Sequence, residues 1–127
     1  MTIHSAARNV ADIPTDGIFY SFCSLVTNPD QYHNMVASFR ARGFSADDCE
    51  FLYADNTAGN SHDGYAGLNT LIHKARGRYV MLIHQDIPAI DDRAQLDRVL
   101  AEIENADPAW AVAGNAGGTA GARPRGA

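Results

Sequence analysis

The sequence predicts a small α/β domain, with a mostly parallel sheet covered by helices on both faces. Two observations lead to this fold class. Apolar, strand-like runs alternate with segments whose apolar residues recur at helical spacing, and strands alternating with helices of this length form parallel sheets with right-handed crossovers. The chain of 127 residues, 46% of them hydrophobic, is long enough for one core but short for two.

The first strand and helix are expected between residues 17 and 43. Residues 17–26, GIFYSFCSLV, are rich in aromatic and β-branched side chains, which favour a strand. Asn28 then suits a helix cap and Pro29 a first helical position, and Gly43 ends the segment. The apolar residues that share one face of this helix are Tyr32, Met35, Val36 and Phe39.

A second strand is predicted over residues 49–53, followed by the polar residues Asp55, Asn56 and Thr57. An amphipathic helix follows and ends at Gly77. Its predicted inner face also carries the amide of Asn69, which must find hydrogen-bond partners if it is buried. The apolar residues of that face are Tyr65, Leu68, Leu71, Ile72 and Ala75.

The last predicted elements are a third strand over residues 79–83, a third helix and a fourth strand over residues 110–113. Pro88 breaks the chain after the third strand, and Asp91 or Asp92 can cap the helix. The helix is indicated by the i, i+3, i+4, i+7 spacing of Leu96, Val99, Leu100 and Ile103.

The predicted organisation is one domain over residues 17–113 between two different ends. Residues 1–16 have the composition of a flexible N-terminal arm, and they lack the pattern of a signal peptide. Residues 114–127 are rich in glycine and alanine, which indicates either a disordered tail or the start of a missing C-terminal part. No apolar run approaches membrane-spanning length, so a cytoplasmic location is expected.

Composition excludes several classes of function. The formal net charge of -5 and the scattered Lys and Arg residues argue against a nucleic-acid partner. The absence of a GxGxxG after the first strand, and of any GxxxxGK[ST], argues against dinucleotide oxidoreductases and P-loop NTPases. Cys23 and Cys49 have no CxxC spacing and are expected to be reduced packing residues.

A candidate site is predicted where the three strands end. Because parallel strands bring their carboxyl ends to one edge, the polar residues that follow them should converge there. These residues are Thr27, Asn28, Asp55, Asn56, Thr57, His84, Gln85 and Asp86. Each also has a local alternative, such as a helix cap for Asn28, a turn for Asp55 to Thr57, and a structural role for His84.

Asp86 is the strongest single candidate, because a carboxylate directly after an apolar strand needs a compensating cation or hydrogen bonds. Hard cations such as Mg²⁺ and Mn²⁺ take carboxylate oxygens and keep places for phosphates. His84 is a second possible ligand, or a hydrogen-bonding partner for a ligand hydroxyl. The alternative for Asp86 is a cap of the turn that follows.

In order and spacing, four segments resemble the amino-terminal, nucleotide-binding half of GT-A glycosyltransferases of the family 2 type. They are VTN at 26–28, YADNT at 53–57, the helix with Asn69, and KARGRYVMLIHQDI at 74–87. The resemblance covers roughly residues 17–118. In the family's A-x-G-x-Y-x-x-x-x-D-x-D segment, Ala75, Gly77, Tyr79 and Asp86 fit, and His84 stands in place of the first aspartate.

The resemblance implies a donor site for a nucleoside diphosphate sugar. It implies that Asp55 contacts the nucleoside, that Thr27 lies close by, and that Asp86 coordinates Mn²⁺ or Mg²⁺ bridging the diphosphate. A complete relative would transfer the sugar to an acceptor hydroxyl, with the metal stabilising the leaving diphosphate. The family's catalytic base and acceptor region are not found in this chain, so it is expected to supply only the donor-binding half.

Two other interpretations remain open from the sequence. A non-catalytic nucleotide-binding module would share the donor residues and lack the base, as would an inactive truncated transferase. An interaction domain would instead use the unfinished sheet, because an exposed strand edge can pair with a partner or with a second copy in a homo-oligomer.

Overall fold

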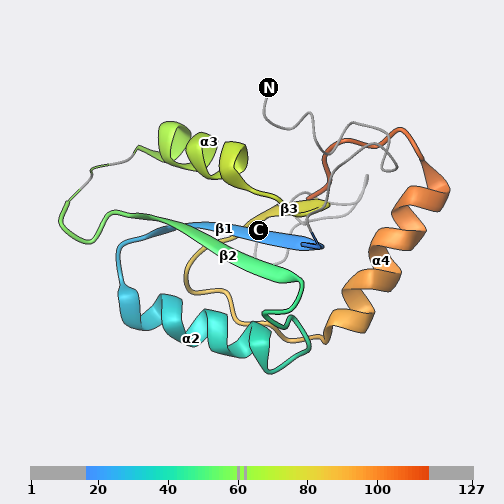
Figure 1. Ribbon diagram of the computed structural model, residues 1–127, viewed down its shortest axis with the longest axis horizontal. Helices are drawn as coiled ribbons and strands as arrows, with labels where there is room; N and C mark the ends of the chain where they lie inside the picture. Colours follow the sequence, from blue (N-terminus) through green and yellow to red (C-terminus); the bar gives the residue numbers. More distant parts are fainter. Residues whose placement is uncertain (1–16, 60, 62, 115–127) are drawn as a thin grey trace, which may run out of the picture.

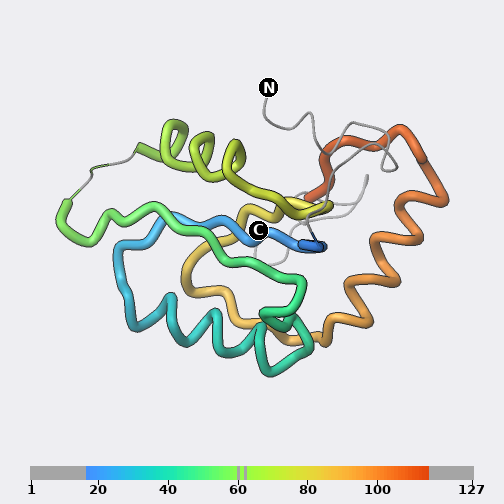
Figure 2. Tube along the Cα trace, viewed as in Figure 1, coloured from blue at the N-terminus to red at the C-terminus, as the bar shows by residue number. Residues whose placement is uncertain are grey.

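The computed structural model describes residues 17–59, 61 and 63–114. Within these ranges the chain folds into a small α/β unit with three strands and three helices (Figure 1, Figure 2). This result confirms the predicted fold class. In chain order the elements are β1 (Tyr20–Val26), α2 (Pro29–Arg40), β2 (Cys49–Asp55), α3 (Gly64–Lys74), β3 (Tyr79–Leu82) and α4 (Arg93–Ala106).

The described strands form a parallel sheet in the order β2-β1-β3, so the first strand of the sequence is the central one. Tyr20 lies opposite Cys49 on one side and Tyr79 on the other, which starts all three strands at the same level. Helix α3 lies over one face of the sheet and α2 over the other, and α4 lies beyond the amino ends of the strands (Figure 1). The carboxyl ends of the strands therefore share one edge, as the sequence predicted.

The larger core lies between the sheet and helices α2 and α4, and it is rich in aromatic rings. Phe22 is at its centre, with ring centroids at 4.9 Å from Phe39 and 4.8 Å from Phe51. Buried members are Tyr20, Phe22, Val26, Tyr32, Met35, Phe39, Phe44, Cys49 and Leu100. The core under α3 is smaller and contains Cys23, Ala54 and Leu71, with half-buried aliphatic neighbours. Cys23 and Cys49 are both free and buried, as expected of packing residues.

Arg93 joins α4 to the amino end of the sheet. Its guanidinium donates two hydrogen bonds to the carboxylate of Asp48, at 2.6 and 2.7 Å. It also lies over the rings of Phe19 and Tyr20, and the hydroxyl of Tyr20 donates to Asp97 of α4 at 2.5 Å. The hydrogen bond from Arg93 lowers the pKa of Asp48, so this pair stays charged near neutral pH.

Most helix boundaries follow the predicted signals, although α3 ends at Lys74, before the predicted stop at Gly77. Asn28 caps α2 by accepting a hydrogen bond from the backbone N–H of Gln31 at 3.1 Å, and Asp92 caps α4 in the same way. Gly43, with a φ of 98°, lies just after the end of α2 in a backbone conformation that favours glycine. Asp63 caps α3 by accepting from the backbone N–H of Ala66, a cap that the sequence did not predict.

Two predictions about the elements are wrong. Residues 110–113 form no strand, because Trp110 stacks on the ring of Tyr79 and its backbone N–H donates to the carbonyl of Asp107. Helix α3 faces the sheet through Gly67, Leu68 and Leu71, so Tyr65 and Asn69 point away from it. Tyr65 is 91% exposed and Asn69 is exposed as well.

The predicted arm at residues 1–16 lies outside the described residues, as does nearly all of the predicted tail at 114–127. Across the part of the chain that the structure describes, no helix combines the length and apolarity needed to cross a membrane.

Candidate functional site

The carboxyl ends of β1 and β3 are joined by one side chain, Gln85. Its Oε1 accepts hydrogen bonds from the backbone N–H groups of Thr27 and Asn28, at 2.8 and 2.9 Å. Its Nε2 donates to the hydroxyl oxygen of Thr27 at 2.8 Å. The predicted convergence of these three residues is correct, but they bind one another. The amide of Gln85 thus occupies the donors that precede α2, where an anionic ligand could otherwise bind.

The residues after β2 form a local turn. The Oδ1 atom of Asp55 accepts from the backbone N–H of Thr57 at 2.9 Å and from its hydroxyl at 2.6 Å, which is the hydrogen bonding of an Asx turn. Asn56 is buried, and its backbone N–H donates to the carbonyl of Val26 at 2.7 Å. Asp55 and Asn56 therefore lie next to the end of β1, and the turn alternative considered for Asp55 is realised.

His84 and Asp86 are both exposed in the turn that follows β3. Among the described residues, no group of three or more His, Cys, Asp or Glu side chains is arranged to hold a metal ion. His84 and Asp86 therefore do not form a metal-binding group with a third His, Cys, Asp or Glu side chain among the described residues. Asn69, on the exposed side of α3, is not directed at the sheet.

The segment Ala75 to Tyr79 has a structural role at the opposite end of the strands. Ser21 donates to Glu50 at 2.6 Å and accepts from the backbone N–H of Gly77 at 2.8 Å. Glu50 is also bound by the guanidinium of Arg76, at 3.0 and 3.1 Å. A Cβ at position 77 would come within 2.6 Å of the backbone N of Ser21, so glycine is required by this close approach.

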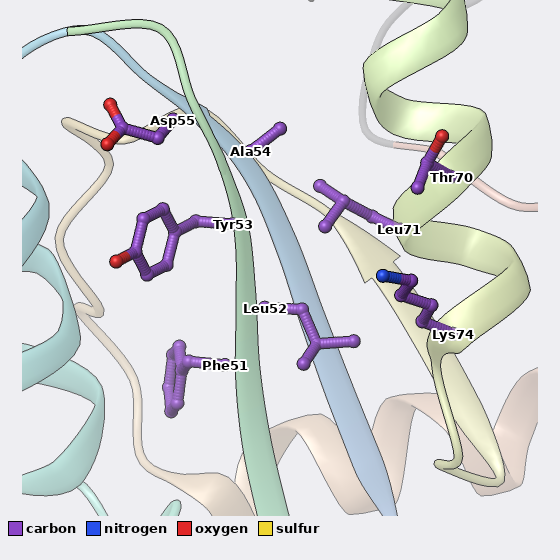
Figure 3. A pocket seen from close by; sticks show the side chains of 8 residues that line it. All are labelled: Phe51, Leu52, Tyr53, Ala54, Asp55, Thr70, Leu71 and Lys74. Atoms are coloured by element: carbon purple, nitrogen blue, oxygen red, sulfur yellow. The ribbon is translucent and has the colours of Figure 1, made fainter.

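A groove of about 350 Å³ lies between β2 and α3 (Figure 3). Its inner surface includes the buried side chains of Ala54 and Leu71, and Leu52 lies beside them. Lys74, on the last turn of α3, points across the groove toward the strand (Figure 3). The residues that line the groove are Phe51, Leu52, Tyr53, Ala54, Asp55, Thr70, Leu71 and Lys74. The sequence predicted an exposed strand edge but did not reveal this groove, because no motif marks it.

Fold and site together define a parallel α/β domain whose strand-end polar groups bind one another and whose edge strand borders an open groove. No family model matches the chain. The chain is similar to a protein of Fuscovulum blasticum named "ATP synthase subunits region ORF 6", with 39% identity over 110 residues. The match covers 85% of this chain and 44% of that protein, so the chain spans less than half the length of this relative.

This comparison contradicts the assignment to the GT-A glycosyltransferases. The name of the relative refers to ATP synthase subunits and not to sugar transfer, and we correct the predicted family and the predicted transferase function accordingly. The structure gives a physical reason for the misleading resemblance. Gly77 is fixed by packing against Ser21, Gln85 by its bonds at the strand ends, and Asp55 by its own turn. Residues interpreted as a donor motif thus have local structural partners.

The prediction of a metal-binding protein is corrected together with the family. The described residues contain no group of three or more His, Cys, Asp or Glu side chains that could hold a metal ion. The nucleotide-binding role assigned to individual residues stays a prediction, as does Mn²⁺ or Mg²⁺ at Asp86 and His84. The residues concerned are Thr27, Asn28, Asp55, Asn56, Asn69, His84 and Gln85.

Proposed function

We propose that this chain is a protein-binding domain and that its partner is ATP synthase. The observation that carries the proposal is the exposure of apolar side chains along both edges of the described sheet. Tyr53 on β2 is 54% exposed and Leu82 on β3 is 48% exposed. Exposed apolar side chains beside an open strand edge are typical of surfaces that bind another chain.

The strand-end edge supports the same proposal. Thr27, Asn28 and Gln85 satisfy one another, and Asp55 is bound to Thr57. These bonds stabilise the ends of the strands, and a small ligand would have to replace them. An arrangement of this kind favours a scaffold that presents its edges to a protein partner. The name of the relative, which mentions ATP synthase subunits, supplies the candidate partner.

The test is a direct binding measurement. The full chain is immobilised through one terminus, and purified ATP synthase from Fuscovulum blasticum is passed over it in biolayer interferometry. We expect saturable binding with a dissociation constant on the order of 10 µM or tighter, as for transient protein pairs. The matched reference is the same chain with Tyr53 and Leu82 both changed to serine, which should bind at least about ten-fold more weakly. Equal binding by the two chains, or none by either, would reject the proposal.

A further inference from the structure

The outward backbone groups of Phe51 and Tyr53 on β2 have no strand partner among the described residues. The backbone N–H of Asn56 donates to Val26, and the carbonyl of Asp48 accepts from Tyr20, so even-numbered positions direct their backbone groups toward β1. Because successive residues of a strand alternate, the N–H and C=O of Phe51 and Tyr53 point to the opposite side. No strand lies on that side within the described part of the chain.

This edge has few of the features that prevent strand pairing. Strand β2, CEFLYAD, contains neither proline nor lysine and pairs with β1 over its whole length, whereas protected edges are short or carry such residues. Helix α3 lies beside the edge and forms the second wall of the groove (Figure 3). A groove between an edge strand and a helix is the arrangement in which domains bind an extended peptide as an added strand.

The groove is lined by one carboxylate and one cation, and Asp55, the carboxylate, accepts two hydrogen bonds from Thr57. Lys74 lines it and is exposed, and its ammonium has no hydrogen-bond or ion-pair partner among the described residues. The nearby cation Arg76 is already paired with Glu50 at 3.0 Å. Lys74 is therefore complementary to a carboxylate on the bound segment. The apolar surface of Leu52, Ala54 and Leu71 is complementary to an aliphatic side chain next to that carboxylate.

We infer that the β2–α3 groove binds an extended, acidic segment of a partner protein by strand addition to β2. The inference deepens the proposed function and rests on it for the identity of the partner. Backbone hydrogen bonds to Phe51 and Tyr53 hold the added strand. An aliphatic side chain of the segment packs on Leu71, and a carboxylate of the segment binds Lys74.

A second copy of the chain is the competing occupant, and charge disfavours it. Its own edge would bring Glu50 and Asp55, and these carboxylates already accept hydrogen bonds from Arg76 and Thr57. A self-paired edge would also bring the acidic side chains of the two copies close together, and like charges that face each other destabilise a strand pair. Self-association through β2 would appear as a molecular mass that rises with concentration and that Tyr53→Pro abolishes, and this result would overturn the inference.

The experiment selects peptides from a phage-displayed library of random short peptides against the full chain. The variant Tyr53→Pro removes an outward N–H without removing a bond to β1, because proline is tolerated on edge strands. Tyr53→Ala is its matched control, since it removes the same ring and keeps the N–H. We expect selected peptides to alternate apolar and polar residues, to contain an acidic residue, and to bind Tyr53→Ala at least about ten-fold more tightly than Tyr53→Pro.

The proposed ion pair between Lys74 and a carboxylate of the bound segment is tested with the same peptides. Lys74→Ala should weaken binding by roughly three- to five-fold, the size expected for an exposed ion pair. Lys74→Glu should weaken it further, and replacing the acidic residue of the peptide by its amide should remove the difference between wild type and Lys74→Ala. Selected peptides that bind all these variants equally would overturn the inference, as would a library that yields no binder.

A hydrogen-exchange measurement on the wild-type chain makes the test independent of how the proline variant folds. Peptide binding should slow exchange of the Phe51 and Tyr53 amides at least about ten-fold and leave those of β3 unchanged. Unchanged exchange at Phe51 and Tyr53 would overturn the inference. If ATP synthase binds Tyr53→Pro as well as wild type, the groove inference fails while the proposed function stands. If peptides bind the groove and ATP synthase does not bind the chain, the proposed partner fails alone.

Discussion

The two faces of the sheet are packed in different ways. The face toward α2 and α4 is a network of aromatic rings, in which Phe22 contacts Tyr20, Phe39, Phe44 and Phe51. The face toward α3 is thin, and its buried members are Cys23, Ala54 and Leu71. Large rings fill the core between the sheet, α2 and α4, whereas fewer residues are buried under α3, which borders a groove at the edge of β2.

One face of the sheet therefore contains most of the buried core, and the other borders the open groove. Aromatic side chains bury large apolar areas and add ring–ring interactions, so the α2 face supplies most of the packing energy. The α3 face has a smaller apolar cluster, and polar contacts among Ser21, Glu50, Arg76 and Gly77 add to it near the amino ends of the strands. Helix α3 is thus held both by Leu71 in the smaller core and by polar contacts just after its carboxyl end, while it borders an open groove.

The largest expected effect is the loss of the aromatic centre. Phe22→Ala leaves a cavity among four rings, and we expect it to lower the free energy of unfolding by about 3–5 kcal/mol. Leu52→Ala, on the α3 face and only half-buried, should lower it by about 1 kcal/mol. Urea unfolding followed by circular dichroism measures both. Equal losses would show that the two faces contribute alike and would contradict the comparison.

An intermediate effect is expected at Gly77. The added methyl group of Gly77→Ala would clash with backbone atoms of Tyr20 and Ser21, which cannot move without disturbing the central strand. We expect a loss of about 2 kcal/mol in unfolding free energy, as for other overpacked sites. Gly64→Ala is the control, because a Cβ at position 64 would meet no atom within 4 Å, and it should be neutral or slightly stabilising. A neutral Gly77→Ala would disprove the close approach.

The smallest expected effect concerns the charge of Glu50. Burial raises the pKa of Glu50, but hydrogen bonds from Ser21 and Arg76 together lower it below its ordinary value of 4.5. A lowered carboxyl pKa contributes stability that is present above the unfolded pKa and is lost as the pH falls through the folded pKa. Between about pH 6 and pH 3, wild type should therefore lose more unfolding free energy than Glu50→Gln.

The difference should be below about 1 kcal/mol, because Arg76 is 56% exposed and solvent screens the pair. Exposed Glu102 supplies the control, and Glu102→Gln should show the pH dependence of wild type. Parallel pH profiles for wild type and Glu50→Gln would show that the polar contacts under α3 do not depend on this charge.

Much of the fold could be predicted from local signals. A few neighbouring residues indicate each of the three strands, the cap at Asn28 and the stop at Gly43, and the structure confirms them. The cap predicted at Asp91 or Asp92 is formed by Asp92. Residues 110–113 look like a strand by composition, yet Trp110 gains more by stacking on Tyr79. The composition of a segment does not show which apolar residues will pack against one another, because this depends on the tertiary structure.

The position of the candidate site could be predicted, but the hydrogen bonds among its residues could not. Thr27, Asn28 and Gln85 do converge, because parallel strands bring their ends together. Their mutual hydrogen bonds depend on side-chain geometry, which spacing alone does not specify. The inner face of α3 was predicted to include Asn69, which is exposed, because helical spacing alone fixes the facing direction only roughly. The groove escaped prediction because it results from how Ala54 and Leu71 pack across the edge of the sheet.

The strand order has a consequence for how the chain folds. Strand β1 is central but is the first strand in the sequence, and Tyr20 pairs with Cys49 and with Tyr79, far along the chain. On the ribosome β1 therefore emerges without either neighbour, and its second edge is covered only after β3 has been synthesised. Contacts that close such long loops slow folding. The described sheet should thus be completed late, after β3 has left the ribosome.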